Sequence, residues 1–263
     1  MSTVRDRGRQ GGLAQATMPE RDRDNFLASK LAHYVDLTEG EMHRLDALQT
    51  GLRSFSRDEL LFREGDGNQD LYIVQSGWLF NYIDTPDGRR QIVNIYHPGD
   101  VIGFPDMALR QRTTNLFAVE DGGLFLMPKA SMADIYKHSP RLAALMLTIA
   151  LREETVLIDR LRTFSRSSAR ARVAYLFLEL HARLRVISGT TSDTLRMPLN
   201  QQEIGDAVGL TNVSVSRATS QLEKAGLIET TPRAVRLKDR DALVELCDFH
   251  DRYAEMQTDW FPH

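Results

Sequence analysis

The stretch PLNQQEIGDAVGLTNVSVSRATSQLEKAGLI, residues 198–228, predicts two short helices joined by a tight turn. Asn200 supplies a side-chain oxygen that suits a helix N-cap, and Glu203 stands three residues later, as in a capping box. Gly209 is expected to end the first helix and Gly226 the second, because glycine adopts the left-handed backbone of a helix end without strain. The inward faces carry apolar residues at helical spacing, which are Ile204, Ala207 and Val208 in the first helix and Val215, Ala218 and Leu222 in the second.

The outward face of the second helix, which Thr211 is expected to cap, carries short polar side chains and a single arginine. They are Asn212, Ser214, Ser216, Arg217 and Gln221. A helix that only faces solvent more often carries Glu and Lys pairs, whereas short polar groups with an arginine suit base edges and phosphates in a DNA major groove. An ordinary helical hairpin is the alternative interpretation. The pattern favours a DNA-recognition element.

The distribution of charge agrees with this prediction, although the whole chain has a net charge of −3. Residues 167–240 hold 11 Lys and Arg against 7 Asp and Glu, a net charge of +4. Residues 241–263 hold 1 basic residue against 6 acidic ones, a net charge of −5. The basic excess therefore coincides with the predicted helix pair, and affinity for phosphates depends on the local patch rather than on the chain average.

Length and composition restrict the class of protein. A chain of 263 residues, 42% hydrophobic and 26% charged, suits about two soluble domains. It has no apolar run of about 18 residues and no signal-peptide core, so we expect a cytoplasmic protein without a membrane span. The single Cys247 rules out an internal disulfide and a multi-cysteine zinc or iron–sulfur site within one chain. No nucleophile elbow, phosphate-cradling loop or HExxH motif occurs, so neither enzymatic activity nor a metal site is expected.

The N-terminal half predicts an arm followed by a β-structure. Residues 1–25 lack hydrophobic periodicity and are expected to be disordered, and helices are expected around residues 26–35 and 39–48. From residue 60 to residue 126 short strands alternate with Gly and Pro, and the clearest strands are residues 71–74, 78–83, 91–96 and 116–119. The sequence TPDG at residues 85–88 is a strong turn signal. Many short strands at this spacing predict a small antiparallel barrel or roll.

A long helix is expected from Ser139-Pro140 to about Arg162, with two apolar stripes. The first stripe is Leu142, Leu145, Ile149 and Val156, and the second is Leu147, Leu151 and Ile158. We expect the first to pack on the roll and the second to pair with the same helix of a twin subunit; the alternative is burial of both within one chain. A serine-rich hinge at residues 164–168, a helix at residues 169–185, a small hairpin (the wing) at residues 228–237 and an acidic helical tail complete the prediction.

With roll, long helix and winged helix-turn-helix in this order, residues 30–240 resemble the CRP/FNR family of bacterial transcription regulators. Residues 198–228 are similar almost throughout to the family's helix-turn-helix pattern. The roll carries a second signature, which consists of Glu64-Gly65-Asp66, Leu71-Tyr72-Ile73-Val74 with Ser76-Gly77, and His97-Pro98-Gly99-Asp100.

The resemblance implies an α+β fold with an N-terminal cyclic-nucleotide-binding-like antiparallel β-roll, a long dimerisation helix and a C-terminal winged helix-turn-helix. The expected parts are a disordered arm (1–25), a sensory roll (26–138), the dimerisation helix and hinge (139–166), a DNA-binding domain (167–240) and an acidic tail (241–263).

The resemblance also implies a homodimer whose second helices enter successive major grooves of a pseudo-palindromic operator, about 34 Å apart. Arg217 matches the arginine that reads guanine, and Ser216 lies where some members contact a base. Val213 departs from the pattern, because well-studied branches have a glutamate there, so the half-site is expected to differ from theirs. The residues expected to contact DNA are Asn200, Gln202, Thr211, Asn212, Val213, Ser214, Ser216 and Arg217.

The effector is inferred from a loop of the roll. Cyclic-nucleotide-binding members hold the ribose with a Gly-Glu pair and the cyclic phosphate with Arg-Ser or Arg-Thr. Here Phe104 follows Gly103, so the ribose-binding carboxylate is missing, while Arg112-Thr113 remains at the phosphate end. Gly103, Arg112 and Thr113 are the candidate effector residues, and an ordinary exposed loop is the alternative for the last two. His97 is the nearest candidate for a haem ligand, but a histidine before Pro-Gly is more typical of a turn.

We therefore predict a homodimeric, sequence-specific DNA-binding transcription regulator with a sensory roll, no cofactor, and RNA polymerase as a further partner. Two alternatives stay open. One is a regulator that responds to a cyclic nucleotide through Arg112 and Thr113. The other is a cyclic-nucleotide-binding regulatory protein that does not bind DNA.

Overall fold

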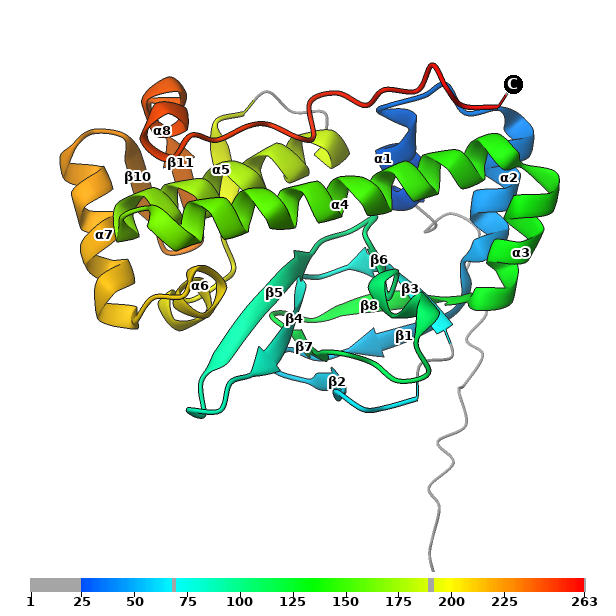
Figure 1. Cartoon of the computed structure of the whole chain (residues 1–263), viewed down its shortest axis with the longest axis horizontal. Coiled ribbons are helices and arrows are strands. Elements are labelled where there is room, and N and C mark those ends of the chain that lie inside the picture. Colours follow the sequence, from blue (N-terminus) through cyan, green and yellow to red (C-terminus); the bar gives the residue numbers. More distant parts are fainter. Residues whose placement is uncertain (1–24, 68–69, 189–191, 263) are drawn as a thin grey trace, which may run out of the picture.

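The computed structural model describes residues 25–67, 70–188 and 192–262, so the arm predicted at residues 1–25 lies, apart from Asn25, outside the described residues. An antiparallel β-roll, a long helix and a C-terminal helical unit follow one another along the chain, and the long helix lies across both of the others (Figure 1). The predicted α+β architecture is confirmed.

Two four-stranded antiparallel sheets form the roll, in the orders β1-β8-β3-β6 and β2-β7-β4-β5. The strands of the first are β1 (Thr50–Phe55), β8 (Gly122–Pro128), β3 (Asp70–Ser76) and β6 (Val101–Ile102). Those of the second are β2 (Leu60–Phe62), β7 (Asn115–Ala118), β4 (Leu79–Asp84) and β5 (Arg90–Tyr96). Leu79, Leu116 and Leu124 belong to the apolar core of the two sheets. The four predicted strands match β3, β4, β5 and β7 to within one or two residues at each end.

Three helices pack around the roll. α1 (Phe26–Ala32) and α2 (Glu39–Leu48) precede it, α3 (Lys129–His138) follows it, and the short helix η2 (Pro105–Ala108) lies between β6 and β7. α2 has its predicted bounds because Thr38 and Glu41 form a capping box at its start. α1 is shorter than predicted, and α3 was not predicted as a separate helix. Leu31 of α1, Leu45 of α2 and Ile135 of α3 share one apolar core with Leu145 of the long helix.

The two predicted apolar stripes of the long helix α4 (Pro140–Arg166) differ in burial. Leu142, Leu145, Ile149 and Val156 are buried, whereas Leu147, Leu151 and Ile158 are 46%, 51% and 58% exposed, so burial of both stripes within one chain is excluded. The second stripe continues to Leu161, which is 71% exposed, and these four residues are called the exposed stripe below. No helix in the described ranges, α4 included, has the length and hydropathy of a membrane span.

The hinge predicted at residues 164–168 is wrong for most of its length. α4 continues through Phe164 to Arg166, and α5 (Ala169–Ser188) begins after two residues, Ser167 and Ser168. The segment contains no Gly or Pro that would stop a helix. The Phe164 ring also packs edge-on against Tyr175 of α5 with centroids 6.3 Å apart, which holds the last turn of α4 in place.

The C-terminal unit is a winged helix-turn-helix. Its elements after α5 are β9 (Thr194–Arg196), α6 (Gln201–Val208), α7 (Asn212–Lys224), β10 (Ile228–Thr231), β11 (Ala234–Leu237) and α8 (Arg240–Cys247). The predicted hairpin of the wing is part of a three-stranded sheet, because β9 pairs with β11. Buried residues of α5, α6 and α7 meet in one core, for example Phe177, Val208 and Val215.

The tail predicted as an acidic helix is helical only in α8. Asp248 takes a left-handed conformation (φ 50°, ψ 48°) that ends α8. Residues 248–262, called the C-terminal strap below, then run back along α4 toward α1 and α2 (Figure 1). Tyr253 and Phe261 are 2% and 5% exposed, and Phe261 belongs to the core that α1, α2 and α4 share. Burial of these rings, rather than a continued helix, determines the path of the tail.

Candidate DNA-binding surface and effector site

Local contacts hold the two helices of the predicted DNA-recognition element. Asn200 Oδ1 accepts a hydrogen bond from the Glu203 amide at 2.9 Å, and the Glu203 carboxylate accepts one from the Asn200 amide at 2.8 Å, which is the predicted capping box. Gly209 ends α6 in the left-handed conformation (φ 67°). A Cβ at Gly205 would lie 2.6 Å from the Leu210 carbonyl oxygen, so glycine is needed where the turn approaches α6.

α7 starts at its predicted cap and has one buried and one exposed face. The Thr211 hydroxyl accepts a hydrogen bond from the Ser214 amide at 3.2 Å. Val215 and Leu222 are fully buried, whereas Val213 is 70% exposed and leaves its methyl groups accessible. The residues predicted to contact DNA are all exposed except Ser214, which is half-buried: Asn200, Gln202, Thr211, Asn212, Val213, Ser214, Ser216 and Arg217.

One of these residues is oriented by a contact that starts in the roll. Gln202 Nε2 donates to Asp206 Oδ1 at 2.7 Å. Asp206 is buried and forms an ion pair with Arg90 of β5 at 3.0 Å, while Gln91 Nε2 donates to the Asp206 carbonyl at 2.8 Å. α6 is therefore docked on the edge of the roll through its polar side.

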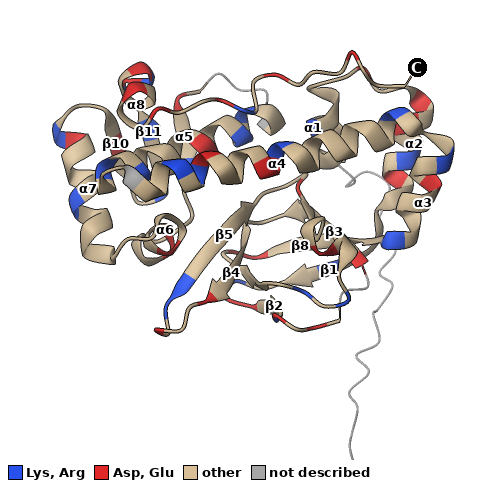
Figure 2. Ribbon diagram, viewed as in Figure 1, with Lys and Arg blue, Asp and Glu red and all other residues tan. Residues whose placement is uncertain are grey.

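The charges on the C-terminal unit follow the division found in the sequence. α7 carries two basic residues and one acidic residue, whereas α8 and the C-terminal strap together carry mostly Asp and Glu (Figure 2). Arg217 and Lys224 are the basic residues of α7, and both are exposed. The face of α7 that carries short polar groups thus also offers cations to phosphates.

Known proteins resemble both halves of this arrangement. A cyclic nucleotide-binding domain model matches residues 52–139, and a Crp-like helix-turn-helix domain model matches residues 171–246. The Anaerobic regulatory protein of Haemophilus influenzae is 25% identical over 218 residues, which are 83% of this chain and 84% of that protein. The structure of FixK2 from Bradyrhizobium japonicum is 28% identical, covers 74% of this chain and 96% of its own, and superposes with a TM-score of 0.66. The chain belongs to the CRP/FNR family of transcription regulators.

The fumarate and nitrate reduction regulatory protein of Escherichia coli is a further relative, 25% identical over 83% of this chain and 87% of its own length. These relatives are named as regulators, which agrees with the prediction that this CRP/FNR chain is a DNA-binding transcription regulator and not an enzyme.

In this CRP/FNR regulator a carboxylate of the chain lies against the predicted effector residues. The Thr113 hydroxyl donates to Asp106 Oδ1 at 2.6 Å, and the Thr113 amide donates to the same oxygen at 3.2 Å. Arg112 is 5% exposed and its guanidinium lies 4.0 Å from the centroid of the Phe62 ring, so the exposed-loop alternative is wrong for Arg112. Thr113 is exposed, as that alternative predicts. Gly103 has a φ of +103°, which favours glycine at the start of this loop.

This geometry differs from the cyclic-phosphate site that the resemblance implies. The donors of Thr113, which the resemblance assigns to the cyclic phosphate, are already used by the Asp106 carboxylate. A phosphate that bound to Thr113 would have to displace the Asp106 carboxylate from these two donors. Phe104, at the position of the family's glutamate, has no group that accepts from a ribose hydroxyl.

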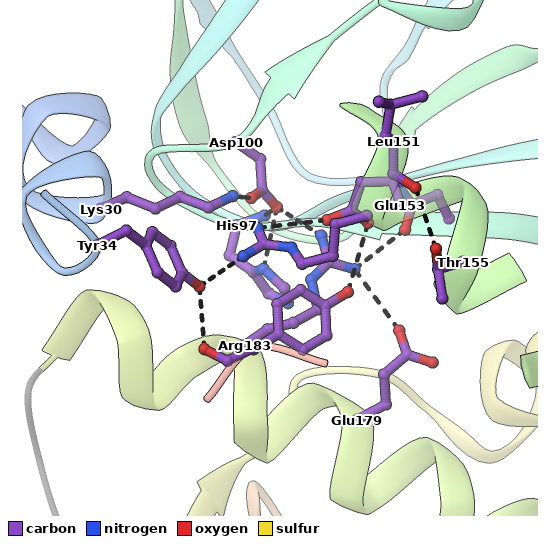
Figure 3. Close-up of polar contacts among 12 residues, drawn as sticks. Lys30, Tyr34, His97, Asp100, Leu151, Glu153, Thr155, Glu179 and Arg183 are labelled. Atoms are coloured by element: carbon purple, nitrogen blue, oxygen red, sulfur yellow. Dashed lines mark hydrogen bonds and ion pairs between the residues drawn. The ribbon is translucent and has the colours of Figure 1, made fainter. Parts of the chain in front are cut away.

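A buried cluster of charged residues joins the roll to α1, α4 and α5 (Figure 3). Asp100, in the turn before β6, accepts from Lys30 of α1 and, at 2.8 Å, from Arg183 of α5. Glu179, one turn earlier in α5, accepts from Arg160 of α4 at 2.7 Å. Burial alone would raise the pKa of Asp100, but Lys30 and Arg183 reverse this effect and hold the pKa well below its usual range. Asp100 is therefore ionised at neutral pH.

His97, the candidate haem ligand, lies within this cluster. Its Nδ1 is 3.1 Å from Asp100 Oδ2, and its amide donates to the same carboxylate at 2.9 Å, so it closes the turn as the alternative interpretation predicts. Burial, followed by the charge of Arg183, lowers the pKa of His97, so its ring is neutral at pH 7. In the parts of the chain that the structure describes, no group of three or more His, Cys, Asp or Glu is placed to hold a metal ion.

The sequence prediction missed this cluster. Lys30 and Asp100 are 70 residues apart and Asp100 and Arg183 are 83 apart, so no local pattern connects them. Glu179 and Arg183 stand four residues apart within a mainly apolar stretch of α5, residues 173–184, and both are buried. A charged pair at this spacing on an apolar helix face is the signal that could have indicated a buried ionic contact.

Proposed function

We propose that this regulator acts as a homodimer on a pseudo-palindromic operator and that α4 forms the dimer contact. The exposed stripe is the observation that carries this proposal. Its residues lie at positions 147, 151, 158 and 161, which is the three-and-four spacing of a coiled-coil seam with position 154 omitted. They are 46–71% exposed in the single chain, and full burial of one such side chain contributes roughly 1.5–3 kcal/mol.

Each α7 would read one half-site in a major groove. The Arg217 guanidinium would donate to guanine O6 and N7, the Val213 methyl groups would pack on a thymine methyl, and Ser216 would contact a neighbouring base edge. The other candidates lie at the N-terminal ends of α6 and α7, where backbone amides favour phosphates: Asn200, Gln202, Thr211, Asn212 and Ser214. RNA polymerase is the further partner that we propose for the DNA-bound dimer.

The signal reaches the DNA-binding unit through contacts rather than through a flexible hinge. We propose that the chain divides into the roll (26–138), the dimerisation helix (139–166), the DNA-binding unit (167–240) and the acidic segment (241–263). Arg90 holds α6 and Asp100 holds α5, so a change in the roll would alter the orientation of α7 in each subunit. An effector then shifts the population toward the spacing that matches the operator.

Selection of genomic DNA fragments with the full chain, followed by gel-shift titration of the selected site, tests recognition by α7. Arg217→Ala should weaken binding by roughly 1–3 kcal/mol and relax selectivity at one base position. Arg44→Ala, which removes an exposed arginine of α2, should leave affinity unchanged. Unchanged affinity and selectivity of Arg217→Ala would contradict the role of α7. Failure to recover any selected sequence would favour the alternative that does not bind DNA.

Sedimentation velocity tests the dimer contact. Ile158→Glu should convert the dimer to a monomer, because it places a charge in the seam of α4. Leu109→Glu is the matched control, since Leu109 is a similarly exposed apolar residue outside α4. A dimer that persists in Ile158→Glu would exclude this face of α4.

The alternative, a regulator that responds to a cyclic nucleotide, predicts that cAMP or cGMP is the effector. cAMP or cGMP would raise the melting temperature and tighten DNA binding if Arg112 and Thr113 held the phosphate. The contact between Asp106 and Thr113 supports a signal of another kind, and calorimetry with both nucleotides decides between the two.

A further inference from the structure

A cavity of about 530 Å³ lies between the roll, α1 and α4, which is within the usual size range of small-molecule sites. Apolar side chains from all three parts line it, for example Leu31 of α1, Val93 and Val101 of the roll, and Met146, Ala150 and Val156 of α4. Gly103, Arg112 and Thr113 are not among its lining residues. Phe104, Pro105 and Met107 of the same loop do line it, so the cavity lies beside the candidate phosphate site and does not include it.

The charged residues of the cavity wall are already paired with one another. Each cation that lines it has a carboxylate partner: Lys30 and Arg183 pair with Asp100, and Arg160 pairs with Glu179. Two further carboxylates of α4, Glu153 and Glu154, also line the wall. An anionic ligand would lose its hydration here without gaining an unpaired cation from the described wall residues, so a neutral ligand is favoured.

One polar group of the wall is left with bonding capacity. Asn81 of β4 donates from Nδ2 to Thr114 Oγ1 at 3.2 Å, while its buried Oδ1 has no hydrogen-bond partner among the described residues. If the amide is turned by 180°, Nδ2 is the atom without a partner instead. A ligand hydroxyl or amide can donate or accept, so it would satisfy Asn81 in either orientation and remove the cost of an unpaired buried group.

The cavity reaches the contacts that hold the DNA-binding unit. Arg183 of α5 and Asp100 of the roll both line it, and their ion pair at 2.8 Å joins these two parts (Figure 3). Arg160 also lines it and ties α4 to the Val93 carbonyl at 2.6 Å. A molecule that occupies the cavity therefore touches the same side chains that fix α5 relative to the roll and α4.

We propose that this cavity is the effector site, that its ligand is a neutral, largely apolar small molecule with a hydroxyl or amide group, and that occupancy adjusts how α5 is held on the roll. This inference rests on the proposed function of the roll as the sensory domain. It replaces the cyclic phosphate chemistry that Arg112 and Thr113 suggested with binding driven by apolar burial and one hydrogen bond.

Titration of the full chain with N-phenyl-1-naphthylamine, a neutral apolar fluorescent probe, tests the site. We expect saturable fluorescence enhancement that cAMP does not displace. Ala150→Phe fills the cavity and should weaken probe binding by about tenfold or more. Ala130→Phe adds the same volume to the exposed surface of α3 and should leave binding unchanged. Absence of saturable binding, displacement by cAMP, or equal affinity of Ala150→Phe and wild type would each overturn the proposal.

A displacement series in the wild-type chain gives a second readout that does not depend on the folding of Ala150→Phe. 1-Naphthol, which carries a hydroxyl, should displace the probe at lower concentration than naphthalene, and Asn81→Leu should remove this difference. Equal displacement by the two compounds in wild type would exclude the hydrogen bond to Asn81. Gel shifts on the same samples separate the two proposals: failed probe tests with intact DNA selectivity overturn this inference alone, whereas loss of selectivity in wild type overturns the proposed function.

Discussion

Replacing Arg183 with methionine removes the cation that attaches α5 to the roll. The Arg183 and Asp100 side chains are each 4% exposed, and Arg183 donates to Asp100 at 2.8 Å and to Asn94 Oδ1 at 3.0 Å. Methionine retains most of the apolar volume, so the loss is mainly electrostatic. Removing one partner of a buried ion pair costs roughly 3–5 kcal/mol, and because Asp100 keeps Lys30 we expect the lower end, about 3 kcal/mol.

Arg185→Met is the matched control, two residues further along α5. The Arg185 side chain is 36% exposed and pairs with Asp251 at 3.0 Å, and such a partly exposed pair contributes roughly 0–1 kcal/mol. Urea unfolding, followed by circular dichroism and by the fluorescence of the buried Trp78 in the roll, measures both variants. A loss of unfolding free energy in Arg183→Met no larger than that in Arg185→Met would refute the electrostatic argument.

The same cluster predicts how stability depends on pH. Burial would raise the pKa of Asp100, but Lys30 and Arg183 lower it well below its usual range. The stability contributed by ionised Asp100 is therefore present above the pKa of an unfolded aspartate, about 3.9, and is lost as the pH falls from there toward the folded pKa. Below about pH 4 the urea midpoint should fall more steeply for wild type than for Arg183→Met. Parallel curves would contradict this assignment.

Three further changes test other parts of the chain. Asp106→Ala frees the Thr113 amide and hydroxyl, so calorimetry should detect cAMP binding that is absent in wild type; a variant that still does not bind would contradict the role given to Asp106. Phe261→Ala should lower the free energy of unfolding by about 3–5 kcal/mol, because its ring is 5% exposed. Trp260→Ala is the control: Trp260 is 54% exposed, so this change should lower the free energy of unfolding by less than about 1 kcal/mol. Equal effects in urea unfolding would show that the C-terminal strap is not part of the core. Glu154→Leu completes the exposed stripe at its polar position and should tighten the dimer in sedimentation equilibrium, and an unchanged association constant would count against α4 as the contact.

Features set by neighbouring residues could be predicted from the sequence. The helix-turn-helix has its predicted bounds because Asn200, Glu203, Gly209 and Thr211 act within three or four residues of the backbone groups that they cap. The two stripes of α4 were also predictable, since burial follows the helical period. The order of roll, long helix and helix-turn-helix also followed from the sequence pattern. The resemblance then indicated Gly103, Arg112 and Thr113 as effector residues, and the structure shows Thr113 bonded to Asp106 instead.

Features that depend on distant contacts could not be predicted. The partner of Thr113 is Asp106, and nothing in the spacing of the two residues shows that their side chains meet. The hinge was inferred from serines, whereas the packing of Phe164 on Tyr175 extends the helix through that segment. The acidic tail has a helical composition, but burial of Tyr253 and Phe261 against other parts of the chain overrides local propensity.

The C-terminal strap also bears on the order in which the chain folds. The Tyr34 hydroxyl donates to the Tyr253 carbonyl, 219 residues away, and Phe261 belongs to the same core as Leu27 of α1. During synthesis the roll, α1, α2 and α4 can pack before the chain is finished, but the part of their shared core that Phe261 covers stays exposed until the strap has left the ribosome. Contacts between residues so far apart in the sequence form slowly. Until they form, the exposed apolar surface promotes association with other chains. A helix near the start of the described chain is thus completed by a segment near its end.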